Sequence, residues 1–257
     1  MPPLDRPAEI RAILETDRPW SVYALGDLSP GLFPHCRWFA APGPALAMLY
    51  GAFTPPVLLT IGRPDDLRPL LDEIAVEPEV YLHVRTEHLP VLRERFGVQG
   101  EAHMWRMQLR SAERLPADAE GVVPLTSADV PALRALYADG EAAGEAPGFF
   151  APSMVEAGVY FGAVEGGELV AAAGTHLVAP VEGVAAIGNV YTRRDRRGRG
   201  LGRRTTAAVA AELVRRGVPT VVLNVNQGNA AAIRVYEGLG FERYCPFVEG
   251  VAVRRGR

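Results

Sequence analysis

The sequence contains no lysine, and all 27 of its basic residues are arginine. A Walker-type phosphate loop needs a lysine, and Schiff-base and pyridoxal mechanisms form a bond to one, so these enzyme classes are excluded. Cysteine is also scarce: only Cys36 and Cys245 are present, without metal-ligand spacing or a disulfide framework. We therefore expect no metal site, and the scarcity of cysteine is typical of a reducing cytoplasm.

Excess positive charge and long apolar runs are lacking as well. The net charge is -3 and the pI is near 6.0, which argues against binding nucleic acid or a membrane surface through bulk charge. Pro55 and Pro56 interrupt the longest apolar stretch, Ala45–Gly62, so no membrane-spanning helix is predicted. The first residues, MPPLDRPAEI, lack the basic flank and apolar core of a signal peptide. We expect a cytoplasmic protein that binds neither nucleic acid nor membranes.

The 257 residues, 48% of them hydrophobic, suffice for one large or two ordinary domains with a buried core. The polar, proline-containing stretch Ser111–Glu120 is the best candidate for a linker. We place the boundary near residue 116, which gives domains 1–116 and 117–257. In the first, the pattern predicts a helix over Pro7–Glu15, strands within 36–61, a helix from Pro64, a strand at 80–84, a helix at 88–95 and a strand at 103–109.

The second domain opens with a predicted strand at 122–125 and a helix whose start is marked by Thr126 and Asp129 at capping-box spacing. Predicted strands and helices then follow in this order: strands at 158–164, 168–178 and 184–191, a helix at 202–216, a strand at 219–225, a helix at 229–239 and a strand at 241–247. The fold class is α/β (α+β), with a mixed, mostly antiparallel sheet flanked by helices.

One internal similarity links the domains. The segment starting YLHVRTEHLPVL in the first and the segment starting VVLNVNQGNAAA in the second share the plan strand, polar loop, helix, strand. Two similar halves in tandem would explain this, although any strand–helix–strand unit shows the same plan. Both explanations stay open at this stage.

The stretch Asn189–Arg204, NVYTRRDRRGRGLGRR, places a glycine-rich turn between a strand and a helix. Amide hydrogens of Gly198, Gly200, Leu201 and Gly202 would point outward at a helix start, where the macrodipole favours anions. Glycine allows the backbone to approach a phosphate closely. The arginines of this stretch, with Asp195 as the only acid among them, indicate a ligand that carries several phosphates.

Two other kinds of ligand would also suit a glycine- and arginine-rich turn. A dinucleotide fingerprint, G-x-G-x-x-G, begins at Gly198 but has Arg203 in its last glycine position, so it fails. An RNA-binding arginine patch is the other alternative, but it would leave the glycines without a purpose.

The turn resembles the GNAT superfamily of acyl-CoA N-acyltransferases. Arg197-x-x-Gly200-x-Gly202 matches the family motif (Q/R)-x-x-G-x-(G/A), and VYTRRDRRGRGLG looks like the glycine N-acyltransferase-related branch. Downstream, LNVNQGNAAAIRVYEGLGF resembles the family's closing motif. The resemblance covers about residues 118–250 and implies a GNAT-like fold and acetyl-CoA, or another acyl-CoA, as co-substrate.

The resemblance also implies where the cofactor lies. The strand through Val190, Tyr191 and Thr192 should splay from its neighbour and pair with the pantetheine arm, one amide polarising the thioester carbonyl. The turn of Arg197, Gly198, Arg199, Gly200, Leu201, Gly202 and Arg203 should hold the pyrophosphate. Asn229, the expected helix cap, should lie near the cofactor arm. The four asparagines of the chain all lie in these two motifs, which favours a functional use.

Catalytic residues follow from the resemblance less sharply. Tyr236 occupies the position of the family's tyrosine that protonates the leaving sulfur, although it shares a helical face with Ala232 and Ile233 and would also suit a core. His176 is a candidate general base because its intrinsic pKa suits proton removal, but a lone strand histidine is more often packed or solvated. Glu141 and Glu145 lie in the loop that shapes the acceptor site in the family, where a carboxylate could bind or deprotonate an amine. A water chain could also replace a single base.

The first half lacks any R-x-x-G-x-G turn. If it is a degenerate GNAT-like unit, it should shape the acceptor site or an interface. The implied function is direct transfer of an acyl group to a primary amine of a small molecule or amino acid. A non-catalytic acyl-CoA-binding or sensing protein is the alternative, and a homo-oligomer is possible. No metal is expected.

Overall fold

The computed structural model describes residues 3–74, 76–116 and 121–256. The chain forms two compact units. Unit 1 consists of Met1–Arg106, Val225–Asn229 and Arg243–Arg257, and unit 2 of Met107–Asn224 and Ala230–Glu242. This division differs from two consecutive domains that meet near residue 116, because the C-terminal segment Arg243–Arg257 belongs to unit 1. Residues 117–120 of the predicted linker lie outside the described residues.

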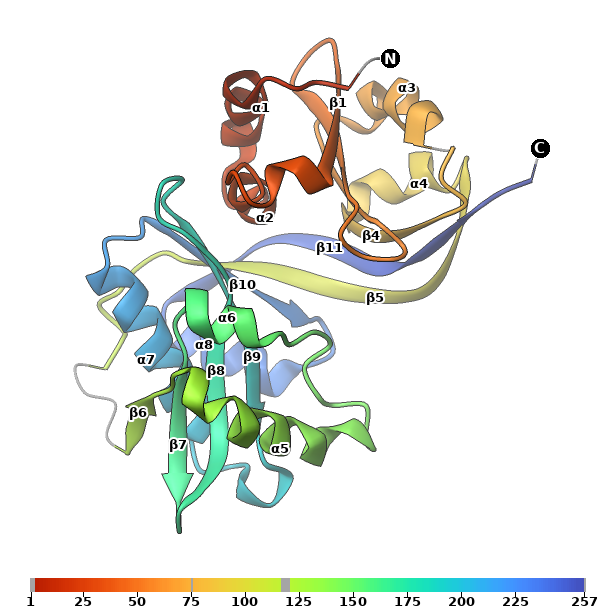
Figure 1. The fold of residues 1–257 in the computed structure, drawn as a ribbon. Helices are drawn as coiled ribbons and strands as arrows, with labels where there is room; N and C mark the ends of the chain where they lie inside the picture. The colour runs from red at the N-terminus through yellow and green to blue at the C-terminus, as the bar shows by residue number, and fades with distance from the viewer. Residues whose placement is uncertain (1–2, 75, 117–120, 257) are drawn as a thin grey trace. The chain divides into compact units, whose positions relative to one another are not determined.

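Unit 1 begins with helices and continues with a sheet (Figure 1). Its elements are α1 (Pro7–Leu14), α2 (Val22–Gly26), β1 (Cys36–Ala41), β2 (Ala45–Tyr50), β3 (Val57–Ile61), α3 (Pro64–Ile74), β4 (Glu79–Arg85), α4 (Leu89–Leu92) and β5 (Phe96–Leu109), which continues into unit 2. β1, β2 and β3 pair antiparallel, and β3 and β4 pair parallel. Strand β11 (Phe241–Arg254) then pairs antiparallel with β4 from Phe247 to Val253.

Unit 2 contains the strands β6 (Val122–Pro124), β7 (Phe161–Glu165), β8 (Glu168–Ala179), β9 (Val184–Thr192) and β10 (Thr220–Asn226), whose last residues belong to unit 1. Its helices are α5 (Val130–Glu141), α6 (Pro152–Ala157), α7 (Leu201–Arg215) and α8 (Ala230–Gly238) (Figure 1). The strand order is β10-β9-β8-β7-β6, with β9 and β10 parallel and the other ladders antiparallel. A mixed, mostly antiparallel sheet flanked by helices is therefore confirmed.

Helices cover both faces of the unit 2 sheet. Ala172 of β8 packs with Leu133 of α5 and Val155 of α6 in one buried cluster. Its neighbour Ala171 packs with Leu201 of α7 in another. Successive strand residues point to opposite faces, so each face of β8 buries its own helices. Among the described helices, none has the length and apolarity needed to cross a membrane.

The two halves of the chain follow one plan. In the first, β1, β2 and β3 are antiparallel, α3 leads to β4 parallel to β3, and α4 leads to β5. In the second, β7, β8 and β9 are antiparallel, α7 leads to β10 parallel to β9, and α8 leads to β11. This shared order is the one that a tandem of similar halves predicts.

The predicted elements are all present, and all but two lie within a few residues of their expected bounds. β5 begins at Phe96 and not at residue 103. The capping box of Thr126 and Asp129 is confirmed: the Thr126 amide donates to Asp129 Oδ2 over 2.8 Å. Two short helices, α2 and α6, were not predicted, because each is too short to show a periodic pattern. β11 runs to Arg254 and not to residue 247, because its second part pairs with β4.

Candidate functional site

The glycine-rich turn links β9 to α7 in unit 2. Gly198 has φ +78° and Gly200, which caps α7, has φ +74°, a left-handed conformation that side chains disfavour. A Cβ at either glycine would meet no atom within 4 Å, so the space above the turn is open. No backbone hydrogen bond among the described residues uses the amides of 198–203, and the first helical bond is Arg204 N–H to Gly200 O. These outward amides at a helix start suit an anion with several oxygens.

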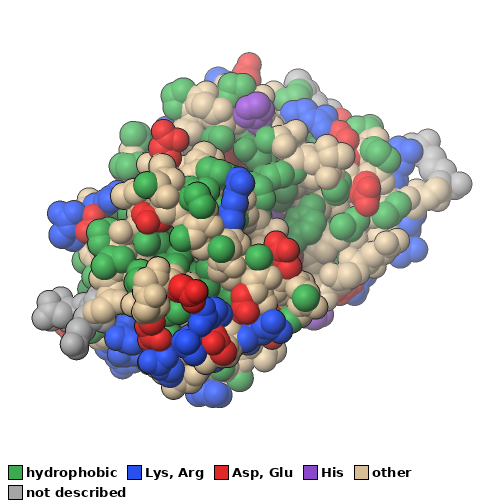
Figure 2. Space-filling view, turned by 60° about the horizontal axis from the view of Figure 1, so that its bottom comes forward, with side chains coloured by type: hydrophobic (Ala, Val, Ile, Leu, Met, Phe, Trp, Pro, Cys, Tyr) green, Lys and Arg blue, Asp and Glu red, His purple; other side chains and the backbone are tan. Residues whose placement is uncertain are grey.

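The arginines around the turn are matched by carboxylates from distant segments. The ion pairs are Arg193–Glu168, Arg193–Asp195, Arg194–Asp139, Arg196–Asp195, Arg196–Glu165, Arg197–Glu145 and Arg199–Glu165. Figure 2 shows acidic side chains interspersed with arginines at the lower edge of the face in view. The local sequence suggested Asp195 as the only counter-charge. The structure adds carboxylates from β7, β8, α5 and the loop after α5. Arg203 is exposed and forms no ion pair within the described residues.

Arg197, the first residue of the motif, has three kinds of partner. Its Nη2 donates to Glu145 Oε2 over 2.7 Å, its Nε donates to the Thr192 carbonyl over 3.2 Å, and its guanidinium lies 5.7 Å from the centre of the Tyr191 ring. The hydrogen bond from Arg197 lowers the pKa of Glu145. A carboxylate that is stabilised in its charged form is a weaker base, so the pair argues against Glu145 as the general base.

The described ladder between β9 and β10 ends before β9 does. The parallel register runs from Val184–Thr220 to Ile187–Leu223, whereas β9 continues to Thr192. Val190, Tyr191 and Thr192 therefore lie beyond the described ladder with β10. On its other side β9 remains paired with β8, through Tyr191–Ala172 and Thr192–Ala171.

Asn189 is the residue in β9 where the register changes. Its φ is +52°, and no other non-glycine residue within the described parts of the chain has a positive φ. Asparagine tolerates this conformation better than most residues do. The ladder between β8 and β9 shifts on either side of the Gly174–Gly188 pair, which leaves this part of β9 bulged. Tyr137 donates to the Asn189 carbonyl over 3.0 Å. The asparagine clustering in the sequence pointed here, but it did not reveal a bulge.

A directional hydrogen-bond network fixes the His176 ring. Tyr160 Oη donates to the Thr175 carbonyl over 3.2 Å, and accepts from Asn189 Nδ2 over 2.8 Å. Asn189 Oδ1 therefore faces His176 Nε2, 3.2 Å away. Because this oxygen can only accept, Nε2 carries the proton of the neutral ring and the lone pair lies on Nδ1.

Tyr236 lies on α8 in unit 2 and is 7% exposed. Its ring meets Phe241 edge-on, with centroids 6.3 Å apart. Burial raises the pKa of Tyr236 to about 12, so the phenol remains protonated at neutral pH. No hydrogen bond among the described residues joins it to His176 or to the turn. Asn229, directly before α8, belongs to unit 1, and its amide donates to the Asn226 carbonyl over 2.9 Å.

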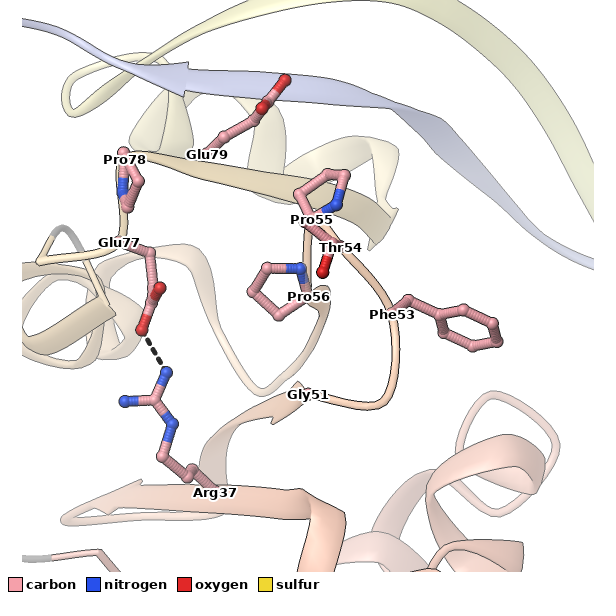
Figure 3. A pocket seen from close by; sticks show the side chains of 9 residues that line it. All are labelled: Arg37, Gly51, Phe53, Thr54, Pro55, Pro56, Glu77, Pro78 and Glu79. Carbon is pink, nitrogen blue, oxygen red and sulfur yellow. Dashed lines mark hydrogen bonds and ion pairs between the residues drawn. The ribbon is translucent and has the colours of Figure 1, made fainter.

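Unit 1 has a pocket of its own, of about 420 Å³. Figure 3 shows the ion pair between Arg37 and Glu77 at one side, and Pro55 and Pro56 at another. None of the residues that the sequence predicts to bind the cofactor or to act in catalysis lines this pocket. Among the described residues, no group of three or more His, Cys, Asp or Glu side chains could hold a metal ion.

The model of the acetyltransferase (GNAT) family matches residues 130–241. The [ribosomal protein bS18]-alanine N-acetyltransferase of Escherichia coli K12 is 35% identical over 107 residues, which cover 39% of this chain and 70% of that protein. The chain belongs to the GNAT family. The match contains β9, the glycine-rich turn, His176 and Tyr236, so this family region is the one that carries the candidate site.

Other relatives match more narrowly or in fold alone. The mycothiol acetyltransferase of Thermobispora bispora is 43% identical over 89 residues, 33% of this chain and 30% of that protein. The structure of a GCN5-related N-acetyltransferase from Kribbella flavida superposes with a TM-score of 0.64 at 18% identity. The match covers 93% of this chain and 95% of that one. For a GCN5-related N-acetyltransferase from Sphaerobacter thermophilus, the match covers 100% of this chain and 96% of that one, with a TM-score of 0.58 and 18% identity. These two structures share the fold over nearly the whole chain.

Proposed function

We propose that this GNAT protein transfers the acetyl group of acetyl-CoA to a primary amine of a small molecule. The observation that carries the proposal is the turn between β9 and α7, with its open glycines, unpaired amides and arginines inside the region that the family matches. This donor set fits a pyrophosphate, which accepts hydrogen bonds from amides and guanidinium groups together.

The residues that hold the cofactor follow from this placement. The amides from Gly198 to Arg203, with the side chains of Arg197, Arg199 and Arg203, receive the pyrophosphate. Val190, Tyr191 and Thr192 offer to the pantetheine arm the backbone edge that no longer pairs with β10. The family resemblance assigns Asn229, directly before α8, to the cofactor arm as well. The bound group supplies an activated acetyl thioester, and the chain orients it.

His176 is proposed as the general base. Its neutral ring presents a lone pair on Nδ1, because Asn189 holds the proton on Nε2. That lone pair takes a proton from the acceptor ammonium, and the neutral amine then attacks the thioester carbonyl within a ternary complex. No covalent bond between substrate and enzyme forms in this series of steps.

Tyr236 is proposed as the acid. Its phenol gives a proton to the departing sulfur as the carbon–sulfur bond breaks and the amide bond forms. A phenol is protonated at neutral pH, and burial raises the pKa of Tyr236 further, to about 12, so a proton is present when the sulfur departs. The attacking nitrogen loses its second proton as the intermediate collapses, and this proton restores the Tyr236 phenol, while His176 returns its own proton to solvent. The products are then the neutral acetylated amide and the thiol form of coenzyme A, so atoms and charge balance.

The acceptor is proposed as a small molecule, an amino acid or a related amine. One group of relatives is named mycothiol acetyltransferase, and another is named for an alanine of a ribosomal protein. Mycothiol is a small molecule, so the first name supports this kind of acceptor. The narrower resemblance to the glycine N-acyltransferase-related branch stays a prediction. We also propose that the first half is a degenerate GNAT-like unit that shapes acceptor binding or an interface between copies of the chain.

A non-catalytic acyl-CoA-binding protein is the second candidate, and the burial of Tyr236 against Phe241, which suits a core residue, favours it. It predicts cofactor binding without turnover. Amine-dependent thiol release separates the two.

The cofactor site is tested by calorimetry with two matched glycine variants. Gly200→Glu should abolish coenzyme A binding, because it adds a carboxylate where the pyrophosphate lies and strains a residue at φ +74°. Gly217 has the same φ, open space around it and a position just after α7, so Gly217→Glu imposes equal strain without touching the turn. Unchanged affinity in a folded Gly200→Glu variant, or equal losses in both, would refute the assignment.

A further inference from the structure

The anionic partner of Arg197 is an exchangeable one. Glu145 Oε2 and Arg197 Nη2 are 2.7 Å apart, and each side chain of the pair is 44% exposed. A solvent-exposed ion pair contributes little to the free energy of folding, because water screens the charges and both side chains lose conformational freedom. A phosphate oxygen, which carries more charge and accepts several hydrogen bonds from the same turn, is the stronger partner for this guanidinium.

The backbone at Glu145 is anchored, so exchange requires only a side-chain rotation. The Glu145 amide donates to the Gly140 carbonyl over 3.0 Å. A Cβ at Gly140 would lie 2.8 Å from the amide nitrogen of Ala146 and from the Tyr191 ring, which shows how closely the loop folds back. The loop therefore stays in place when its carboxylate leaves Arg197.

The loop also lies on the side of the sheet where the His176 network is found. It joins α5 to α6, and Met154 of α6 accepts a hydrogen bond from Asn189 Nδ2 over 3.5 Å. Phe150, at the end of the loop, packs against Tyr137 and Tyr160, with ring centroids 5.1 and 6.3 Å apart. The loop that carries Glu145 is thus packed, through Phe150, against a tyrosine of the network around the proposed base.

We infer that Glu145 exchanges partners during the reaction: it pairs with Arg197 before coenzyme A binds, and it receives the ammonium group of the acceptor after the pyrophosphate has displaced it. This inference rests on the proposed function and gives Glu145 the role of a positioning residue for cationic acceptors. The cofactor then binds first, because the acceptor's anchor is unavailable until Arg197 has a new partner. The repulsion between carboxylate and phosphate around one guanidinium drives the exchange.

The test compares Glu145→Gln with Glu156→Gln, an equivalent change on α6 at a carboxylate without an ion pair among the described residues. In calorimetry without acceptor, Glu145→Gln should bind coenzyme A about 1.5- to 5-fold more tightly, the range expected on removing an exposed ionic competitor. At saturating acetyl-CoA it should raise the acceptor KM several-fold with kcat nearly kept. Glu156→Gln should change neither quantity.

A second comparison separates exchange from a merely structural role. On an Arg197→Gln background, Glu145→Gln should leave coenzyme A affinity unchanged, because there is no longer an ion pair to break. Weaker or unchanged coenzyme A binding in the single variant, or an effect on only one of the two ligands, overturns the inference. Failure of the proposed function has a different signature, since the unmodified protein itself would then not bind coenzyme A or not acetylate any amine.

Discussion

Asn189 shows how one residue links the backbone shape of the site to its chemistry. Its φ of +52° bulges β9 where the strand leaves β10, and its side-chain amide sets the tautomer of His176. Sequence reasoning identified the cluster of asparagines and the candidate histidine. It could not find their contact, because a bulge depends on the register of β8, which no pattern within β9 encodes.

Tyr236 is the residue whose role one substitution decides. Tyr236→Phe should keep cofactor affinity and melting temperature while lowering turnover by ~10²-fold, the usual scale for losing a positioned acid. The pKa of about 12 keeps the wild-type phenol protonated throughout the assay range, so its own titration does not intervene. The effect should shrink as pH rises, because the thiolate then leaves without a proton. Turnover and thermal melting measured together check this.

Wild-type turnover in the phenylalanine variant at every pH would leave Tyr236 as a core residue. Its contact with Phe241 would then be its main contribution. In that case, the stability change should be about 1 kcal/mol or less.

At the scale of elements, the glycines of β8 and β9 make room for the rings of the site. Gly174 and Gly188 are cross-strand partners. A Cβ at Gly188 would overlap the His176 ring, and one at Gly174 would overlap the Tyr160 ring. The two strands can carry both rings only because these positions lack side chains.

Gly188→Ala is therefore expected to displace the His176 ring while the strands remain paired. Turnover should fall toward the ~10²-fold loss of a missing general base, with coenzyme A affinity retained. Gly238→Ala on α8 is the control, since its Cβ meets no atom within 4 Å and alanine favours helix. Equal turnover in the two variants would remove His176 from the mechanism. Steady-state kinetics with calorimetry distinguish the outcomes.

The order of elements was predictable because glycine, proline and capping residues mark their ends. The turn before α7 and the capping box at Thr126 are local signals, and both are found as predicted. The carboxylates that face the turn were not predictable as partners. Glu165, Glu168, Asp139 and Glu145 lie on other elements, and only the fold brings them to the arginines.

At the scale of the whole molecule, the two halves share a plan but not a phosphate-binding turn. The junction of β3 and α3 is the counterpart of the junction of β9 and α7. It reads Gly62-Arg63-Pro64-Asp65-Asp66, where proline lacks an amide hydrogen and two carboxylates occupy the first helical turn. Phosphate would be repelled there.

We therefore expect one coenzyme A per chain. A calorimetric titration should saturate at one equivalent, and Gly200→Glu should remove it entirely. Saturation at two equivalents would show that the first half retains a site of a kind that the motif does not reveal.

The division of the chain was the least predictable feature. A boundary near residue 116 follows from local composition, whereas the C-terminal residues belong to unit 1 through the pairing of β11 with β4. Phe247, Val248 and Ala252 are buried there, as their apolar character suggests. Sequence patterns predict that such residues are buried but not which strand covers them.

Thiol release from acetyl-CoA is the measurement that tests the central claim most directly. The chain, supplied with acetyl-CoA and a panel of small primary amines, should release coenzyme A only when a suitable amine is present, with the acetylated amine detected by mass spectrometry. Gly217→Glu should retain this activity and Gly200→Glu should lose it. Coenzyme A binding at the turn without amine-dependent release or acetylated product from any amine would contradict the claim and identify the chain as an acyl-CoA-binding protein.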